Sequence, residues 1–417
     1  MFDRGSAAPP RHVSASTHRA WPPRRVASVA LIMLCQSTQS LVLGGIALFL
    51  PLIRSSLGLD FAQAGLISAV SILTYSLMQL PSGYLADRIG PKRLFVVGLL
   101  GTNVLAFSFA HLHSYSFVLA NQAASGFFRA LMFAPGLLLI GHLFPPDRRA
   151  TALGLYVAAG LSSNVFLNVV GPVIVKPLGW RSVFSIFSLA GLGVVALYWR
   201  FAPEAPAGAQ GGAAGRGEAL ALLRSRIMWL IGGIQYVRYA LVSAVATWLP
   251  SFIVYDRGHS LQTAGLVVAV GAVASAPANF LGGYISDRLH SPLLVIGGSL
   301  AVLSGTTFAL ARAGSFASII VIATLTYLFL QLYFGPLFSL PIDLFGLRTA
   351  GLASGFSNLF ANVGGFTFAY ALGIVRDRTG SFSDGFYALS VLALVGVGCV
   401  VAVHAAQRRL QPVGTVV

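Results

Sequence analysis

The chain has 417 residues, of which 56% are hydrophobic and only 9% charged, and its mean hydropathy is +0.80. Soluble domains carry about 25% charged residues, so this composition excludes a soluble globular protein. The net charge of +16 comes from Lys and Arg in ones, twos and threes at the ends of apolar runs, which excludes a phosphate-binding stripe for nucleic acid. Two cysteines inside apolar runs, Cys35 and Cys399, indicate no disulfide framework.

Twelve apolar runs follow one another, and each is long enough to cross a hydrocarbon core of about 30 Å. They lie at 26–53, 62–85, 94–111, 115–143, 151–175, 182–201, 227–253, 262–284, 292–311, 316–341, 350–375 and 385–405. We predict an all-α membrane protein with 12 transmembrane helices in two six-helix bundles, residues 26–201 and 227–405. A linker rich in Ala, Gly and Pro, residues 202–226, joins the bundles, and tails of residues 1–25 and 406–417 flank them.

Positive charge sets the expected orientation. With the N-terminus in the cytoplasm, eighteen of the 27 Lys and Arg residues fall on the cytoplasmic side, seven fall outside and two lie within the membrane. This distribution obeys the positive-inside rule, and the opposite orientation would invert it. We therefore expect a multi-pass protein of a bacterial inner membrane, with both termini and the linker in the cytoplasm.

The two halves repeat one pattern. A Gly-Tyr-x-x-Asp-Arg turn at residues 83–88 returns at residues 283–288, each time between apolar runs. Phe-Leu-Pro at 49–51 matches Trp-Leu-Pro at 248–250. A Ser-Asn-x-Phe-x-Asn pattern begins at Ser163 and again at Ser357, so the membrane unit is duplicated.

The first charged turn continues through Gly90 to Lys92 and Arg93, and it resembles the signature loop between helices two and three of the major facilitator superfamily. Pro91 replaces the first of the three basic residues usual in that loop, and His290 replaces the Gly of the second copy. The resemblance covers nearly the whole chain. It implies a secondary transporter with two pseudo-symmetric bundles that works by alternating access.

The resemblance also implies a cytoplasmic gate at the charged turns. Asp87 is expected to face the positive N-terminus of helix eleven, and Gly83 to let the two helices approach. Asp287 is expected to act in the same way in the second half. The alternative, that these turns only anchor the topology, applies more strongly to Arg88.

Two arginines are expected near the bilayer midplane. Arg129 lies about thirteen residues into its helix and Arg238 about eleven, and charges at that depth are costly and usually functional. The resemblance implies that helices one, four, seven and ten line a central cavity, with one arginine from each half. A guanidinium offers a fork of donors that matches carboxylate or phosphate. The alternative is neutralisation by a buried acid, but all eleven Asp and Glu fall in tails, linkers or helix ends.

Further polar residues lie on the same helices and could contact a substrate. Gln235, Arg238 and Tyr239 share one helix face through i, i+3, i+4 spacing. The other candidates for substrate binding are Gln36, Gln39, Gln122, Tyr327, Gln331 and the two i, i+4 pairs Asn164/Asn168 and Asn358/Asn362. Each of these side chains could instead form a hydrogen bond between helices, and helix packing is the interpretation we favour for the Asn pairs.

The predicted function is secondary active transport of a small organic anion, such as a carboxylate, with Arg129 and Arg238 binding the anion. We expect a monomer in the lipid bilayer that uses a proton or an exchanged anion as its coupling ion. We expect no enzyme activity, cofactor, metal or nucleic-acid partner, because metal-ligand spacing, catalytic arrays and nucleotide motifs are missing from the sequence. A drug/proton antiporter of the same fold is the alternative, and a receptor that does not transport is a further one.

Overall fold

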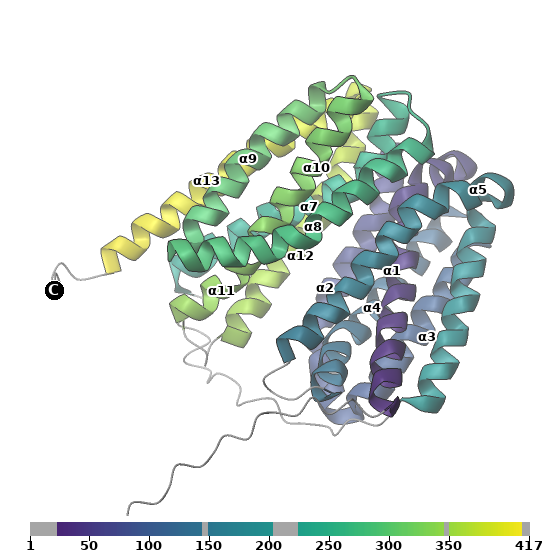
Figure 1. Ribbon diagram of the computed structural model, residues 1–417. Helices are drawn as coiled ribbons and strands as arrows, with labels where there is room; N and C mark the ends of the chain where they lie inside the picture. The colour runs from purple at the N-terminus through teal and green to yellow at the C-terminus, as the bar shows by residue number, and fades with distance from the viewer. Residues whose placement is uncertain (1–22, 144–148, 203–223, 346–349, 411–417) are drawn as a thin grey trace, which may run out of the picture.

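The computed structural model describes residues 23–143, 149–202, 224–345 and 350–410, and all regular structure in these ranges is helical (Figure 1). The predicted tails and most of the predicted linker lie outside them. The helices form two bundles, one drawn from purple to teal and the other from green to yellow.

The first bundle contains five continuous helical segments. They are α1 (Pro23–Leu57), α2 (Phe61–Ile89), α3 (Pro91–Phe109), α4 (Tyr115–Leu143) and α5 (Arg149–Phe201). The chain reverses within α5 at Gly179, whose φ of 74° is a conformation that favours glycine. Near the reversal, Trp180 Nε1 donates a hydrogen bond of 3.1 Å to Ser56 Oγ at the end of α1. At the other end of the bundle, where α5 ends, Lys92 donates a hydrogen bond to the carbonyl of Ala202. The reversal divides α5 into the two predicted helices at 151–175 and 182–201.

The second bundle repeats this order with one break. Its helices are α7 (Arg226–Tyr255), α8 (Leu261–Leu289), α9 (Pro292–Arg312), α10 (Phe316–Leu332), α11 (Phe334–Phe345), α12 (Ala350–Thr379) and α13 (Ser383–Leu410). The predicted single helix at 316–341 is interrupted at Tyr333. Pro336 follows three residues later, where its ring would clash with the carbonyl four residues before it.

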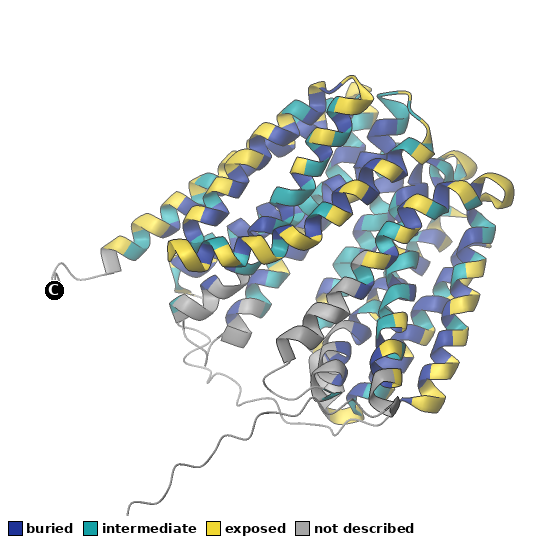
Figure 2. Ribbon diagram, in the orientation of Figure 1, coloured by how far each residue is buried: buried dark blue, intermediate teal, exposed yellow. Residues whose placement is uncertain are grey.

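Ten described helical segments are long and apolar enough to cross a membrane. One of them, Ser162–Phe201, has 40 residues and contains the reversal at Gly179, so it belongs to two passes. The 29-residue α4 lies outside this count. When Ser162–Phe201 is counted as two passes and α4 is added, the arrangement agrees with twelve passes. Large apolar side chains such as Phe280 and Leu294 are exposed on the outer faces of these helices, where lipid would cover them (Figure 2).

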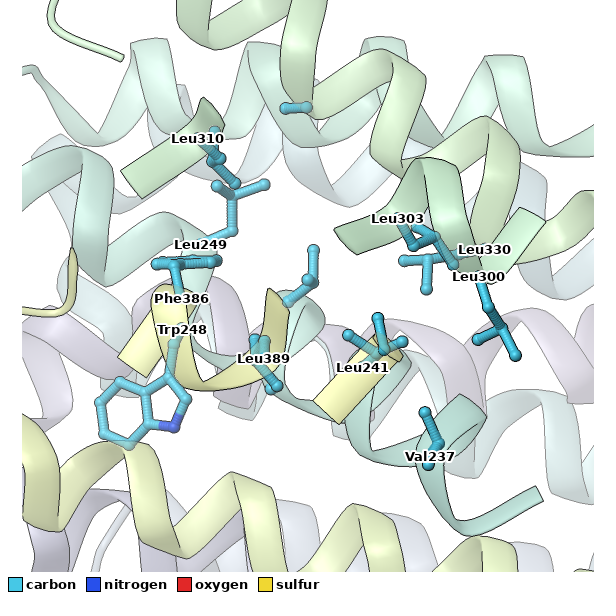
Figure 3. Close-up of a cluster of buried hydrophobic side chains, with 14 of the residues drawn as sticks. Val237, Leu241, Trp248, Leu249, Leu300, Leu303, Leu310, Leu330, Phe386 and Leu389 are labelled. Atoms are coloured by element: carbon cyan, nitrogen blue, oxygen red, sulfur yellow. The ribbon is translucent and has the colours of Figure 1, made fainter. Parts of the chain in front are cut away.

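Each bundle has its own buried core of interlocking apolar side chains. In the second bundle Trp248, Leu249 and Phe386 pack together near one end of α7, and Val237, Leu300 and Leu303 extend the same cluster (Figure 3). In lipid such packing stabilises a bundle through close van der Waals contact, because apolar side chains gain little by leaving lipid.

The two ends of the bundles differ in the connections that they carry. Because the helices alternate in direction, residues 201 and 226, which flank the linker, lie at the end that also carries the α2–α3 and α8–α9 turns. We call this the linker end. The opposite end carries the α1–α2, α7–α8 and α12–α13 connections, and we call it the closed end because the two bundles are joined there.

The bundles meet along two equivalent seams, α2 with α12 and α5 with α8. Gly65 on α2 lies so close to the carbonyl oxygen of Ala369 that a Cβ atom would approach it to 2.6 Å. Gly265 on α8 packs in the same way on the carbonyl oxygen of Asn168, at 2.2 Å. Glycine permits such close backbone approach. The two seams therefore show the internal duplication in three dimensions.

At the closed end Phe61, the first residue of α2, sits among residues of both bundles. Its ring contacts those of Trp248, Tyr255 and Phe382, with ring centroids 6.3, 5.4 and 5.3 Å away. Asp377 of α12 accepts hydrogen bonds of 2.9 and 2.6 Å from the backbone N–H groups of Phe61 and Ala62. A carboxylate there complements the positive N-terminus of α2.

The second charged turn has His290 where the signature has glycine, but its backbone also has a positive φ at this position. Gly90 has φ 91°, and His290 at the matching position has φ 50° and ψ 28°. Both turns therefore need positive φ, which glycine adopts readily and histidine adopts at a cost of about 1–2 kcal/mol. The substitution of Gly by His keeps the α8–α9 turn.

Candidate functional site

A cavity of about 250 Å³ lies between the two bundles. It is lined by residues of α1, α2, α4, α5, α7, α8 and α10. The predicted residues that line it are Arg129, Gln122, Asn164, Asn168, Tyr239, Tyr327 and Gln331. The predicted residues that do not line it are Arg238, Gln235, Gln36, Gln39, Asn358 and Asn362.

Arg129 is the one permanently charged side chain in the described lining of this cavity. Its Nη1 donates a hydrogen bond of 3.0 Å to Ser71 Oγ on α2, and its guanidinium carbon lies 5.2 Å from the centre of the Tyr75 ring. Its Nε is buried and has no hydrogen-bond partner within the described part of the chain. The arginine is therefore held on one side and free to bind on the other.

Acidic residues do not neutralise Arg129 in the described structure. The acidic side chains that it describes are Asp60, Asp256, Asp287, Asp377 and Asp384, and all of them lie at or beside helix ends. Asp256 pairs at 3.3 Å with Arg376 near the closed end. The other six acidic residues lie in, or have side chains in, the parts outside the description.

Arg238 lies at the predicted depth on α7 but does not line the cavity. It is 6% exposed, its guanidinium carbon lies 4.6 Å from the centre of the Phe334 ring, and its Nη1 donates to Gln235 Oε1 at 3.4 Å. The next residue, Tyr239, lines the cavity and interacts electrostatically with both Arg129 and Arg238. Tyr239 is therefore close to both arginines.

The two Asn pairs have different surroundings. Asn168 donates from Nδ2 to Asn164 Oδ1 at 2.8 Å, and both residues line the cavity. Asn362 donates to the carbonyl of Asn358, which itself donates across the α2–α12 seam to Gln79 Oε1. One pair thus faces the cavity and the other joins the bundles.

The glutamines of α1 belong to helix packing in this structure. Gln36 lies against Gly160 of α5, with its Nε2 3.4 Å from the place of a Cβ atom, and Gln39 is 8% exposed. Neither lines the cavity.

Several lining residues were not among the predicted ones. The polar ones among them are small hydroxyl side chains: Ser68 and Ser71 on α2, Ser243 and Thr247 on α7, and Ser275 on α8. The helices α2 and α8 were expected outside the cavity, whereas α7 corresponds to the predicted helix seven. Serine is common in membrane helices, so only the spacing of Ser68, Ser71 and Tyr75 along one face of α2 could have indicated them.

The comparison with known families accounts for this architecture. The sequence profile of the Major Facilitator Superfamily matches residues 32–369. The chain belongs to the major facilitator superfamily. The members of this superfamily are transporters and not enzymes.

Related transporters share most of the length of this superfamily member. A probable sulfoacetate transporter of Cupriavidus necator is 27% identical over 84% of this chain and 86% of its own. A probable galactarate/D-glucarate transporter of Escherichia coli is 26% identical over 82% and 84%. In fold, the chain is similar to a bacterial homologue of the lysosomal transporter Spinster in an inward-facing, occupied conformation, with a TM-score of 0.80 at 15% identity over 93% and 98% of the two chains.

The gate residues implied by the superfamily stay predictions. Arg88 and Asp287 are exposed at the linker ends of α2 and α8. Gly83 and Asp87 lie in α2, but the surroundings of Gly83 and the side chain of Asp87 are outside the described part of the structure. Their contacts with the start of α12 are therefore still to be tested.

Proposed function

We propose that this transporter moves a small organic anion with a carboxylate-like head across a bacterial inner membrane by alternating access. The observation that carries the proposal is Arg129, a fixed cation in the cavity wall with an unpaired Nε and no described carboxylate beside it. A buried charge without a partner is costly, and a bound anion would supply the missing counter-charge. The names of the relatives, which include sulfoacetate and galactarate or D-glucarate transporters, agree with an anionic cargo.

Arg238 is proposed as the second anion-binding residue. Arg238 lies 17 residues before the end of α7 at Tyr255, and Arg129 lies 14 residues after the start of α4 at Tyr115. Both of these helix ends are at the closed end, so Arg238 lies farther toward the linker end than Arg129. Tyr239 is close to both arginines. An anion that leaves Arg129 toward the linker end would therefore reach the level of Arg238 next.

The conformation supports alternating access with exchange at the linker end. The contacts of Phe61 and Asp377 join the bundles on the other side of the cavity, so substrate would enter and leave from the linker side. By the distribution of Lys and Arg, that side is proposed to be cytoplasmic. Movement of the bundles about Arg129 would then open the closed end to the outside.

The coupling follows from the same charges. A carboxylate that could carry a proton is not found at cavity depth among the described residues. We therefore propose exchange of anions, or symport in which the bound anion brings its own proton. The alternative of a drug/proton antiporter would place a cation beside Arg129, which like-charge repulsion opposes.

A screen for the sign of the ligand charge tests the proposed function. Purified protein is heated with pairs of compounds of equal size, each a carboxylate and its primary amide, and with cationic drugs. Binding to the folded state adds about 2.7 kcal/mol of stability at 100 times Kd, so carboxylates raise the unfolding temperature and amides do not.

Two further results in this screen decide between the candidates. The Arg129→Gln variant should lose the carboxylate effect and keep its own unfolding transition. Stabilisation by cationic drugs together with no effect of any carboxylate would reject the anion transporter in favour of the drug exporter.

A further inference from the structure

One face of α2 connects the cavity of this transporter to its second bundle. Ser71, Tyr75 and Gln79 are spaced by four residues, so they form one stripe along the helix. Ser71 accepts the 3.0 Å hydrogen bond from Arg129, Tyr75 lies beside its guanidinium, and Gln79 accepts a hydrogen bond from Asn358 of α12. The stripe thus begins at the anion site and ends at a residue of the other bundle.

Ser71 and Tyr75 restrict the orientation of Arg129. A free arginine side chain loses rotamer entropy when it binds a ligand. Here the hydrogen bond to Ser71 and the ring of Tyr75 already hold the guanidinium on the Nη1 side. The unpaired Nε lies on another edge of the fork, which can bind the two oxygens of one carboxylate or sulfonate head.

The distance between α2 and α4 is fixed at this level. A Cβ atom on Gly126 of α4 would lie 2.1 Å from Thr74 Oγ1 and 2.2 Å from the carbonyl oxygen of Ser71. Further along the pair, Ser82 donates a hydrogen bond of 2.7 Å to the carbonyl of Ala130. Even with this distance fixed, a small rotation or sliding of α2 against α4 would shift Ser71 and Tyr75 relative to the arginine, because Arg129 belongs to α4 and the other two residues belong to α2.

The far end of the stripe is held by the second bundle. Gln79 interacts with the hydroxyl of Tyr75 on its own helix and with Asn358 across the seam. Asn362 in turn donates to the carbonyl of Asn358. The side chains therefore follow one another from Arg129 past the Tyr75 ring to Gln79 and α12, and the Gln79–Asn358 contact must part when the bundles rock.

We infer that Ser71 and Tyr75 are positioning residues for Arg129, and that Gln79 links this arginine to the packing of the two bundles through Asn358. The inference rests on the proposed function, since it assigns Arg129 the role of anion ligand. When the seam between α2 and α12 parts, Gln79 releases Asn358, and Tyr75 and Ser71 shift relative to the guanidinium. Anion affinity then differs between the two conformations, so binding of the anion shifts the population of the two.

The first test needs no ligand. Unfolding temperatures are measured for Tyr75→Leu, Arg129→Gln and the double variant. We expect the decrease caused by Tyr75→Leu to be at least halved when Arg129 is already absent, because the two side chains share one interaction. Equal decreases in both backgrounds would overturn the positioning role of Tyr75.

The second test uses sulfoacetate and D-glucarate as probes and compares affinity with turnover in reconstituted vesicles. Ser71→Ala and Tyr75→Leu should raise Kd about tenfold, the effect of losing one contact to a charged group, and Ser71→Thr should restore it. Tyr75→Phe keeps the ring and should stay within about threefold. Unchanged Kd in Ser71→Ala and Tyr75→Leu would overturn the inference.

The Gln79→Leu variant tests the contact between the bundles independently of anion binding. We expect Kd within about threefold of the wild type and a maximal transport rate about tenfold lower, because the variant removes a contact between bundles and none to the anion. A wild-type rate would overturn the role of Gln79. If neither probe binds the wild type while the unfolding temperatures remain non-additive, the proposed cargo is wrong and the positioning of Arg129 stands.

Discussion

Arg129→Gln is expected to lower the uptake of an anionic substrate into reconstituted vesicles by about 100-fold or more. Removing one partner of a buried, hydrogen-bonded charge pair costs about 2–5 kcal/mol, and each 1.4 kcal/mol is a factor of ten. Glutamine keeps some of the length and hydrogen bonding of the side chain but removes its charge and fork. Uptake of radiolabelled sulfoacetate or D-glucarate at several concentrations measures the effect.

Two control variants make this result specific. Arg129→Lys keeps the charge without the planar fork and should retain part of the activity, since lysine binds as a point charge. Arg312→Gln removes an arginine of α9 that is exposed, lies 4.7 Å from the Phe308 ring and is not part of the cavity lining, and should leave uptake unchanged. Normal uptake by Arg129→Gln would mean that the cavity does not use this arginine for its cargo.

Gly65→Leu is expected to stop transport by preventing closure at the closed end. A Cβ atom at this position meets the carbonyl oxygen of Ala369 at 2.6 Å and the ring of Trp248 at 2.8 Å. Backbone cannot move aside cheaply, and overpacking of this kind costs about 1–3 kcal/mol or more. The variant should therefore populate a conformation in which α2 and α12 are apart, with uptake reduced about tenfold or more.

Cysteine labelling checks where the block occurs. Thr247 is 5% exposed and lines the cavity, so a membrane-impermeant maleimide added at the closed end should label Thr247→Cys slowly. In the Gly65→Leu background labelling should become fast. The matched control is Gly305→Leu, because Gly305 of α9 is exposed and a Cβ atom placed on it would meet no other atom within 4 Å. Slow labelling in both backgrounds would contradict the proposed block.

The fold could be predicted because its signals are local in the sequence. Apolar runs separated by charged turns indicated the order of the helices, and the repeated turn indicated the duplication. The reversal at Gly179 fell between two predicted helices, at 151–175 and 182–201. The break at Tyr333 was not predicted, because a proline within a membrane helix often only bends it.

The residues that line the cavity were predicted in part, and the differences concern which face of a helix looks inward. Arg129 was found because a charge at bilayer depth is rare. Arg238 has the predicted depth, but Tyr239, about 100° further around α7, is the residue that lines the cavity. Counting residues along a helix gives depth, whereas orientation depends on neighbouring helices. The matching Asn patterns beginning at Ser163 and Ser357 show this most clearly, since only the first faces the cavity.

In the proposed mechanism, the single arginine in the described cavity lining also makes the transport cycle sensitive to voltage. Without cargo this lining would carry one positive charge, and a bound monoanion would neutralise it, while Arg238 would keep its charge in both states. Moving one elementary charge through 100 mV is worth about 2.3 kcal/mol, so the membrane potential biases the return of the empty carrier more than the loaded step. With the proposed orientation, a negative interior would draw the empty site toward the cytoplasm, where the anion would bind.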